Sequence, residues 1–367
     1  MALPHPEHAV SLGPAAWALL LSRAILITGS LVYKATRALV SPKQRNGRSF
    51  YEYLAYEGLG DYQCGLSAVR IQNLLPTTSK KCLRFAKAHN LDYAKIPILD
   101  DKTIALWLGP RKPAKLVVHF HGGGYACPAL GAQINMAFGF RPRPDVAVVV
   151  LQYALASEKA NHYPYQLQQA AALLQHILHT ELIPASAITL VGDSAGGHLL
   201  LGLLMHINHP NPAVPPVTVG ENKFAGAALI SPRIEIESNL LLESSATKPR
   251  DIIRPASLEY WGRNFLGGAP RDPWNNVLSA PAEWWADLPV DDLLVTFGEC
   301  ELFRDDIARL CEVVKESTHY TGKITAVEGA GELHEHMVMN RFLGMNRACE
   351  TETAYVEWFE QRVGTRS

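Results

Sequence analysis

The sequence predicts an α/β fold with a mainly parallel sheet and helices on both of its faces. Apolar runs rich in Val, Ile and Leu recur from about residue 94 onward, and stretches with helical spacing separate them. Continuous apolar runs are typical of strands that are buried on both faces. Strands that alternate with helices favour parallel crossover connections. A chain of 367 residues is long enough to bury such a sheet.

Eight strands are expected in chain order. The first two, 94–100 and 103–109, are predicted to form a hairpin around the residues DDK. Six more are expected at 114–120, 146–153, 187–192, 224–231, 292–298 and 322–329. Helical spacing predicts helices between them, with 165–178 and 304–315 among them.

Two regions depart from this alternation. Residues 1–90 look helical throughout, and 235–290 is an irregular insertion rich in Trp. We expect 91–234 and 291–367 to form the α/β domain. The two other regions are expected to form a cap above the carboxyl edge of the sheet, where open α/β sheets bind ligands.

Composition excludes several classes of function. A net charge of -1 and a pI near 6.9 give no electrostatic basis for binding nucleic acid. The six cysteines are scattered and form no C-x-x-C pair. This pattern argues against a zinc site or a disulfide framework, so we expect free thiols and no metal.

The N-terminal stretch 12–38 is strongly apolar, but it lacks the basic start and the cleavage site of a signal peptide. Arg23, Ser30, Lys34 and Arg37 fall on one narrow face of a helix. Three basic groups count against a membrane-spanning helix. We expect the helix to pack on the protein's own surface and the protein to be cytoplasmic. Peripheral membrane contact through 12–38 and a true span are the alternatives.

The stretch LVGDSAGGHLL places Ser194 in the pattern G-x-S-x-G, between Gly192 and Gly196. An apolar strand precedes it and a helical stretch follows it, which is the context of a nucleophile elbow. The small residues allow the sharp turn that exposes the serine hydroxyl. Ser194 is therefore the predicted nucleophile.

A second glycine-rich loop, HGGGY at 121–125, directly follows a strand. Glycines allow backbone N–H groups to approach a substrate oxygen. Together with the elbow about 70 residues later, this loop predicts an oxyanion hole formed by the N–H groups of Gly122, Gly123 and Ala195.

These motifs resemble the hormone-sensitive-lipase-like, or GDSAG-type, branch of the α/β-hydrolases. The resemblance rests on HGGGY, on YALASE at 153–158, on GDSAGGHL at 192–199 and on LISP at 229–232. It covers roughly residues 94–345 and implies an α/β-hydrolase fold, hydrolysis of carboxylesters and no cofactor. It also implies that 91–234 and 291–367 are the catalytic domain and that the cap combines the N-terminus with a late insertion.

In this family the catalytic histidine lies in a short loop after the last strand, which here contains His334 and His336. The resemblance favours His334, which directly follows the glycine-rich stretch, with His336 flanking the pocket. The chain order Ser, acid, His agrees with the fold.

The acid is sought in VTFGECELFRDD, after the strand 292–298. Helical spacing from Phe303 puts Asp305 and Asp306 in the first turn of a helix, where they favour the helix dipole. Glu301 stays in the loop. The family pattern G-x-D-x-L-x-D would place the acid at Cys300. A one-residue insertion with a glutamate in place of aspartate makes Glu301 the predicted partner of the histidine.

The combined prediction is a serine carboxylesterase that cleaves a small or medium apolar ester through an acyl-enzyme. Ser194, Glu301 and His334 form the predicted triad, and Tyr125, Trp284 and Trp285 are the predicted substrate contacts. Acyl transfer to another acceptor, a biosynthetic role in secondary metabolism, and a non-catalytic small-molecule receptor are the alternatives. The sequence leaves the oligomeric state open.

Overall fold

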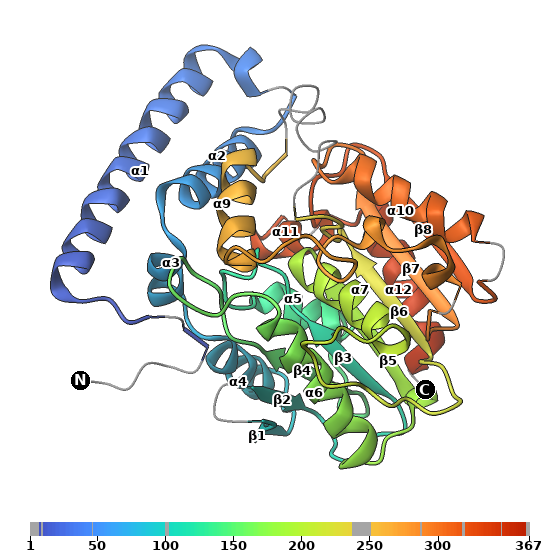
Figure 1. The fold of residues 1–367 in the computed structure, drawn as a ribbon. Coiled ribbons are helices and arrows are strands. Elements are labelled where there is room, and N and C mark those ends of the chain that lie inside the picture. Colours follow the sequence, from blue (N-terminus) through green and yellow to red (C-terminus); the bar gives the residue numbers. More distant parts are fainter. Residues whose placement is uncertain are drawn as a thin grey trace.

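The computed structural model describes residues 7–8, 10–45, 47–99, 103–236, 251–286, 288–317, 320–345 and 347–364. Its centre is an eight-stranded sheet in the order β1-β2-β4-β3-β5-β6-β7-β8 (Figure 1). The strands are β1 (Tyr93–Pro97), β2 (Ile104–Leu108), β3 (Leu116–Phe120), β4 (Ala147–Gln152), β5 (Ile188–Asp193), β6 (Gly226–Ile230), β7 (Asp292–Gly298) and β8 (Lys323–Gly329).

The first three strands of the sheet order pair antiparallel, and β4, β3, β5, β6, β7 and β8 pair parallel. The predicted hairpin and the six later strands are therefore confirmed. The residues between β1 and β2 at 100–102 lie outside the described part of the chain.

Helices cover both faces of the sheet, as predicted. One face carries α6 (Tyr165–His179), α7 (Ala195–Asn208) and α10 (Arg304–Glu316). The other face carries α4 (Thr78–Ala88), α5 (Gly131–Ala137), α11 (His336–Phe342) and α12 (Glu350–Val363). The whole arrangement can be followed in Figure 1.

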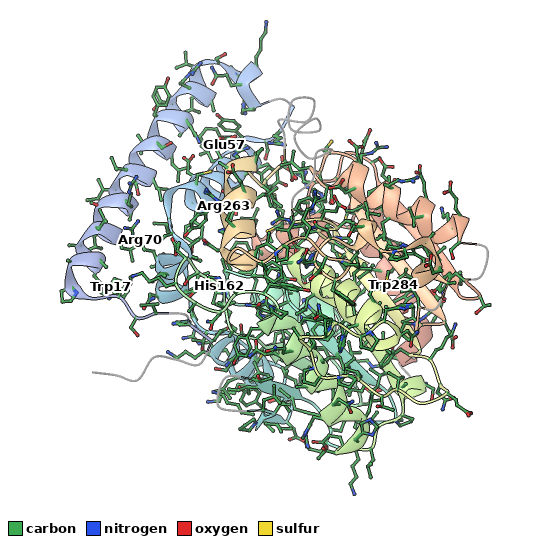
Figure 2. All side chains as sticks on the ribbon, in the orientation of Figure 1. Trp17, Glu57, Arg70, His162, Arg263 and Trp284 are labelled. Atoms are coloured by element: carbon green, nitrogen blue, oxygen red, sulfur yellow. The ribbon has the colours of Figure 1, made fainter. Side chains whose placement is uncertain are left out.

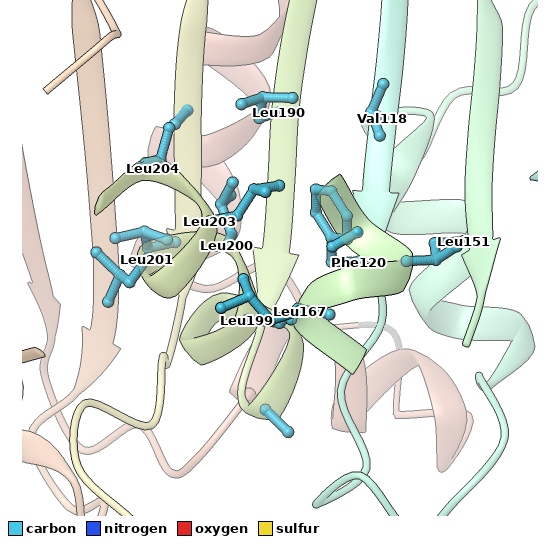
Figure 3. Close-up of a cluster of buried hydrophobic side chains, with 14 of the residues drawn as sticks. Val118, Phe120, Leu151, Leu167, Leu190, Leu199, Leu200, Leu201, Leu203 and Leu204 are labelled. Carbon is cyan, nitrogen blue, oxygen red and sulfur yellow. The ribbon is translucent and has the colours of Figure 1, made fainter. Parts of the chain in front are cut away.

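Alternate strand residues supply the two cores, because successive side chains of a strand point to opposite faces. Val118 and Phe120 pack with leucines of α7 such as Leu200 and Leu203 (Figure 3). Val117, one residue away, joins the core of the opposite face. Each core side chain that is removed from water contributes about 1.5–3 kcal/mol, which explains why the strands read as unbroken apolar runs.

The remaining helices form a layer beside the carboxyl edge of the sheet: α1 (Pro14–Val40), α2 (Phe50–Gly65), α3 (Ala68–Leu74) and α9 (Pro255–Leu266). A capping box between Ser49 and Glu52 begins α2. The two predicted cap regions meet where α9 packs on α2. Their boundaries at 1–90 and 235–290 stay predictions, and residues 237–250 of the second lie outside the described residues.

Candidate active site

Ser194 lies on the sharp turn between β5 and α7. Its backbone has φ 49° and ψ -115°, a conformation that is costly for a residue with a side chain. Its N–H donates to the carbonyl of Ile230 at 2.9 Å, which holds the turn against the end of β6. A Cβ atom on Gly196 would overlap the carbonyl oxygen of Phe120, so the turn requires glycine there. The predicted elbow is present.

His334 is the histidine that reaches the serine. The Ser194 hydroxyl and Nε2 of His334 are hydrogen-bonded at 2.9 Å, and both side chains are buried. His336 instead begins α11, and its Nδ1 accepts from the backbone N–H of Leu333 at 3.4 Å. The two candidate histidines therefore have different places: His334 contacts the serine, and His336 lies at the start of α11.

Glu301 is fully buried in the loop after β7. Its Oε2 accepts from the hydroxyl of Ser231 at 2.7 Å and from the N–H of Gly298 at 3.0 Å. Its Oε1 and Nδ1 of His334 are both buried and have no hydrogen-bond partner among the described residues. A buried polar atom without a hydrogen-bond partner is costly. Nδ1 of His334 can donate a hydrogen bond and Oε1 of Glu301 can accept one, so a bond between them would satisfy both atoms.

The other carboxylates of this stretch have different places. Asp305 and Asp306 lie in the first turn of α10, as predicted. Glu299 is exposed and accepts from the N–H of Gly331 at 2.8 Å.

The pKa values of this centre follow from its burial. Burial lowers the pKa of His334 to about 3, so its imidazole is neutral at neutral pH and can accept a proton. Burial, followed by the nearby charge of Asp251, raises the pKa of Glu301 to about 8. A positive charge on His334 would lower the pKa of a neighbouring carboxyl group, since opposite charges favour ionisation.

The prediction for Gly122 does not hold in this structure, because its N–H is already used. It donates to Oδ2 of Asp193 at 2.9 Å. Gly123 and Gly124 follow with φ of 107° and 61°. Only glycine adopts such φ values readily, and without side chains the backbone N–H groups of this loop can approach a substrate oxygen. Ala195 begins α7, where the helix dipole also favours negative charge.

Asp193 fixes this glycine loop to the elbow. Besides Gly122 it accepts from Nε2 of His119 at 2.7 Å and from Nε2 of Gln133 at 2.6 Å. The carboxyl group of Glu335, next to His334, also hydrogen-bonds to Asp193. Burial and the charge of Asp193 raise the pKa of Glu335 well above its ordinary value, so it carries the shared proton. One carboxylate therefore ties three loops together.

Tyr125 is buried beneath the glycine loop. Its hydroxyl is hydrogen-bonded to Nδ1 of His198 at 2.6 Å, and its ring stacks on Phe265 with centroids 3.9 Å apart. Both the hydroxyl and the ring of Tyr125 are therefore in contact with other protein side chains.

Trp284 and Trp285 lie on the short helix η4 (Ala282–Trp285). Trp284 stacks on His209, with ring centroids 4.2 Å apart. His209 follows the far end of α7, and α7 has 14 residues, so the residue on which Trp284 stacks is about 20 Å along the helix from Ser194. Figure 2 shows Trp284 on the side of the molecule that is remote from α1. Trp285 is buried in the apolar core.

A different tryptophan of the Trp-rich insertion lies beside the glycine loop. Trp261 of α9 covers the glycine loop so closely that a Cβ atom on Gly124 would come within 2.6 Å of its ring. Its indole nitrogen is buried without a partner among the described residues. Trp261 and not Trp284 is the tryptophan beside the predicted oxyanion hole. In the sequence, only its position within the insertion distinguishes Trp261 from the other tryptophans of that region. Position alone does not predict which of them lies beside the glycine loop.

Within the described part of the chain, no group of three or more His, Cys, Asp and Glu side chains is arranged to hold a metal ion. The site brings together a serine, a neutral imidazole, buried carboxyl groups and backbone N–H donors.

This fold and this elbow define a class of proteins. The model of the alpha/beta hydrolase fold family matches residues 117–338, and the chain belongs to that family. The solved structures that it resembles include a hormone-sensitive-lipase homologue from a metagenome library, at a TM-score of 0.59 and 18% identity over 78% of this chain and 91% of that one. The resemblance in fold to hormone-sensitive-lipase-like esterases is thereby confirmed.

The curated relatives match this chain over only part of their own length. Steryl acetyl hydrolase 1 of Saccharomyces cerevisiae is 24% identical over 63% of this chain and 56% of its own length. An acetyl-hydrolase of Streptomyces hygroscopicus is 25% identical over 56% of this chain and 64% of its own length. The chain thus spans less than two thirds of each relative.

Proposed function

We propose that the protein is a serine esterase that removes a short acyl group, such as acetyl, from an apolar alcohol. The observation that carries the proposal is the 2.9 Å contact of Ser194 Oγ with Nε2 of His334 on a strained elbow. A neutral imidazole at this distance is a competent general base.

The reaction follows the order of acyl transfer to serine. Ser194 attacks the ester carbonyl while its proton passes to His334, and the imidazolium then gives that proton to the departing alcohol. Water, deprotonated by the same imidazole, cleaves the acyl-enzyme and releases the acid. We propose that Glu301 Oε1 accepts from Nδ1 of His334 and stabilises the imidazolium. We further propose Gly123, Gly124 and Ala195 as the donors to the oxyanion.

The size of the acyl group is inferred from two sources. Trp261 lies over Gly124, and only 8% of Ser194 is exposed, which leaves little room beside the nucleophile. The curated relatives are named for the hydrolysis of acetyl groups, from sterols in one case. Both favour a small acyl part, with the alcohol supplying the apolar bulk.

The rival readings make different demands. A receptor has no use for a neutral histidine bonded to a nucleophilic serine, so the geometry favours an enzyme. Transfer to an alcohol uses the same groups as hydrolysis and differs only in the acceptor of the acyl group. An added alcohol that diverts product from acid to ester would identify transfer.

The test is covalent labelling with a fluorophosphonate, followed by a series of nitrophenyl esters. We expect wild type to be labelled and Ser194→Ala not to be. We expect kcat/KM to fall at least tenfold from the acetate to the decanoate. Equal labelling of both proteins would refute the serine mechanism, and a preference for long chains would refute the acyl assignment.

We also propose that α1 lies on a membrane surface. It is long and apolar enough to cross a membrane by length and composition, with a mean hydropathy of 1.7 and 6% of that window buried. Many of its apolar side chains are exposed, although Leu20 is buried. Those of Ile25, Val32 and Leu39 form one stripe and are 72%, 62% and 67% exposed.

The inward side of α1 is mixed. Leu20 and Ile27 pack on the protein there, and Ser30 and Lys34 of the same side make polar contacts with α2. Lys34 is 2.6 Å from Asp61 and 2.9 Å from Glu57 of α2, and Ser30 donates to Asp61 at 2.7 Å. Figure 2 shows Trp17 on the outlying helix and Glu57 on the layer behind it. These ion pairs dock one side of α1 on the protein, which favours a helix in the membrane surface over one that spans it.

Replacing the stripe by Ile25→Ser, Val32→Ser and Leu39→Ser together should weaken binding to phosphatidylcholine vesicles by roughly 100- to 1,000-fold, since each exposed side chain contributes about 1–1.5 kcal/mol when buried. Flotation of the full chain measures it. Leu182→Ser, which removes a 76% exposed leucine elsewhere, is the control. Equal flotation of the triple variant and wild type would refute the membrane surface.

A further inference from the structure

A further buried carboxylate, that of Asp251, lies beside the catalytic loops and belongs to none of the sequence motifs described above. Asp251 precedes α9 in the cap and is 2% exposed. Its Oδ1 accepts from the backbone N–H of His334 at 3.1 Å and from that of Ile252 at 2.7 Å. Its Oδ2 accepts from the N–H of Leu302 at 2.8 Å. The side chain is thus fully used, and all of its partners are backbone amides.

The partners of Asp251 are placed where a triad needs support. Leu302 directly follows Glu301, and the N–H of His334 belongs to the histidine itself. The loops after β7 and β8 are therefore held at one spacing by the two oxygens of a single carboxylate. Charge-assisted bonds of this kind are roughly twice as strong as neutral ones.

Asp251 is also tied to the cap. Arg254, three residues on, donates to the carbonyl of Asp251 at 3.2 Å and to Oε1 of Glu57 on α2 at 3.1 Å. The clamp on the catalytic loops is thus anchored outside the sheet, in the layer that covers it.

The charge of Asp251 acts on Glu301 as well. After burial, it is the largest cause of the raised pKa of Glu301. Glu332 adds to this effect, and Glu335 also interacts with Glu301. Arg254 is the cation that faces Asp251, whose own pKa burial raises to about 6. Removing the charge of Asp251 should therefore lower the pKa of Glu301.

We propose that Asp251 is a positioning residue of the active site, which clamps the acid loop and the histidine loop to each other and to the cap. The inference rests on the proposed function, because it assigns Asp251 a part in the work of Ser194, His334 and Glu301. Asp251 itself does not touch substrate in this role.

The first experiment is the pH profile of Asp251→Asn with nitrophenyl acetate. An asparagine keeps one acceptor oxygen and so releases one of the two loops. We expect kcat to fall about 10- to 100-fold, as small displacements of catalytic groups do, with KM within about threefold of wild type. The limb of the profile that reports Glu301 should move to lower pH.

A matched control is Asp292→Asn. Asp292 is also a buried carboxylate that accepts side-chain hydrogen bonds, from Trp358 at 2.9 Å and from Arg362, but it begins β7 at the opposite end of the strand from Glu301. This variant should lose stability and keep the wild-type pH profile. An Asp251→Asn variant whose profile keeps its position, with kcat lowered equally at every pH, would overturn the proposal.

A measurement on wild type covers the case in which Asp251→Asn fails to fold. The amide resonances of Leu302 and His334 should shift together with one apparent pKa between pH 5 and 7, because one carboxyl group binds both. Independent or absent shifts would overturn the clamp. Fluorophosphonate labelling of wild type reports the proposed function separately, so its failure would leave the amide result to decide the clamp alone.

Discussion

Replacement of Glu301 by glutamine tests the most heavily buried part of the proposed triad. Glutamine keeps the size of the side chain and an oxygen that can accept from Ser231 and Gly298. It removes the negative charge that the imidazolium of His334 would need. We expect kcat of Glu301→Gln to fall by roughly 100- to 10,000-fold, because the histidine loses both its orientation and its counter-charge.

The same variant has a stability signature that follows from the pKa of Glu301. Burial and the charge of Asp251 raise that pKa from 4.5 to about 8 in the folded protein. The folded state then binds the proton more tightly than the unfolded state, so stability is greatest below pH 4.5 and is lost as the pH rises through 8. The slope is about 1.4 kcal/mol per pH unit, or roughly 4 kcal/mol between pH 5 and 8.

Urea unfolding of both proteins at pH 5, 6, 7 and 8 measures this difference. The buried histidines are present in wild type and variant alike, so subtracting one curve from the other reports Glu301 together with its effect on the coupled carboxyl groups of Asp251 and Glu335. Relative to wild type, Glu301→Gln should gain stability steadily from pH 5 to 8. Parallel curves would show that Glu301 is not the buried acid described here.

Asp305→Asn provides the comparison for activity. Asp305 lies in the first turn of α10 and pairs with Arg304 at 3.1 Å, with 39% of its side chain exposed. Its removal costs at most a few tenths of a kcal/mol, since exposed pairs contribute little. Equal and mild losses of turnover in Asp305→Asn and Glu301→Gln would remove Glu301 from the triad.

Two further substitutions test the glycine loop and its supports. Tyr125→Phe leaves Nδ1 of His198 without its partner in a buried site, which should cost about 1–3 kcal/mol in urea unfolding while KM for nitrophenyl acetate stays within about twofold. A large rise in KM would instead favour the predicted substrate contact. Gly124→Ala adds a methyl group where φ is 61° and the ring of Trp261 lies, so kcat/KM should fall at least 100-fold; an unchanged rate would exclude Gly124 from the oxyanion hole.

The sequence sufficed for elements that depend on local patterns. Apolar runs predicted the six inner strands because a strand buried on both faces leaves few polar positions, whereas the edge strands β1 and β8 are largely half-buried or exposed. The turn at Ser194 was predictable because the G-x-S-x-G pattern between a strand and a helix is a local signal, although the contact that requires glycine at 196 is with Phe120 of a neighbouring strand. The choice of His334 rested on the family resemblance, and the chain order agreed with it, since the loops after successive parallel strands meet at one edge of the sheet.

What the sequence could not supply are contacts between distant segments. The loss of Gly122 as an oxyanion donor depends on Asp193, 71 residues away, turning its side chain across to the glycine loop. Asp251 belongs to no sequence motif. Its proposed role depends on the cap, which brings its carboxylate into contact with the loops of Leu302 and His334 at once. Trp261 and Trp284 lie in the same Trp-rich insertion, and composition cannot say which of them reaches the catalytic edge.

The orientation of α1 depends on contacts with another helix, but the residues that make these contacts follow a pattern that can be seen in the sequence. Ser30 and Lys34 are four residues apart, and so are Glu57 and Asp61 on the next helix. Residues at this spacing share a helix face, and the two polar pairs are complementary in charge. They predict two helices that dock with these polar side chains in contact, which leaves the stripe of Ile25, Val32 and Leu39 on the outward side of α1. An exposed stripe on a helix held by ion pairs therefore has a cause in the sequence, and its length points to a surface that can cover it.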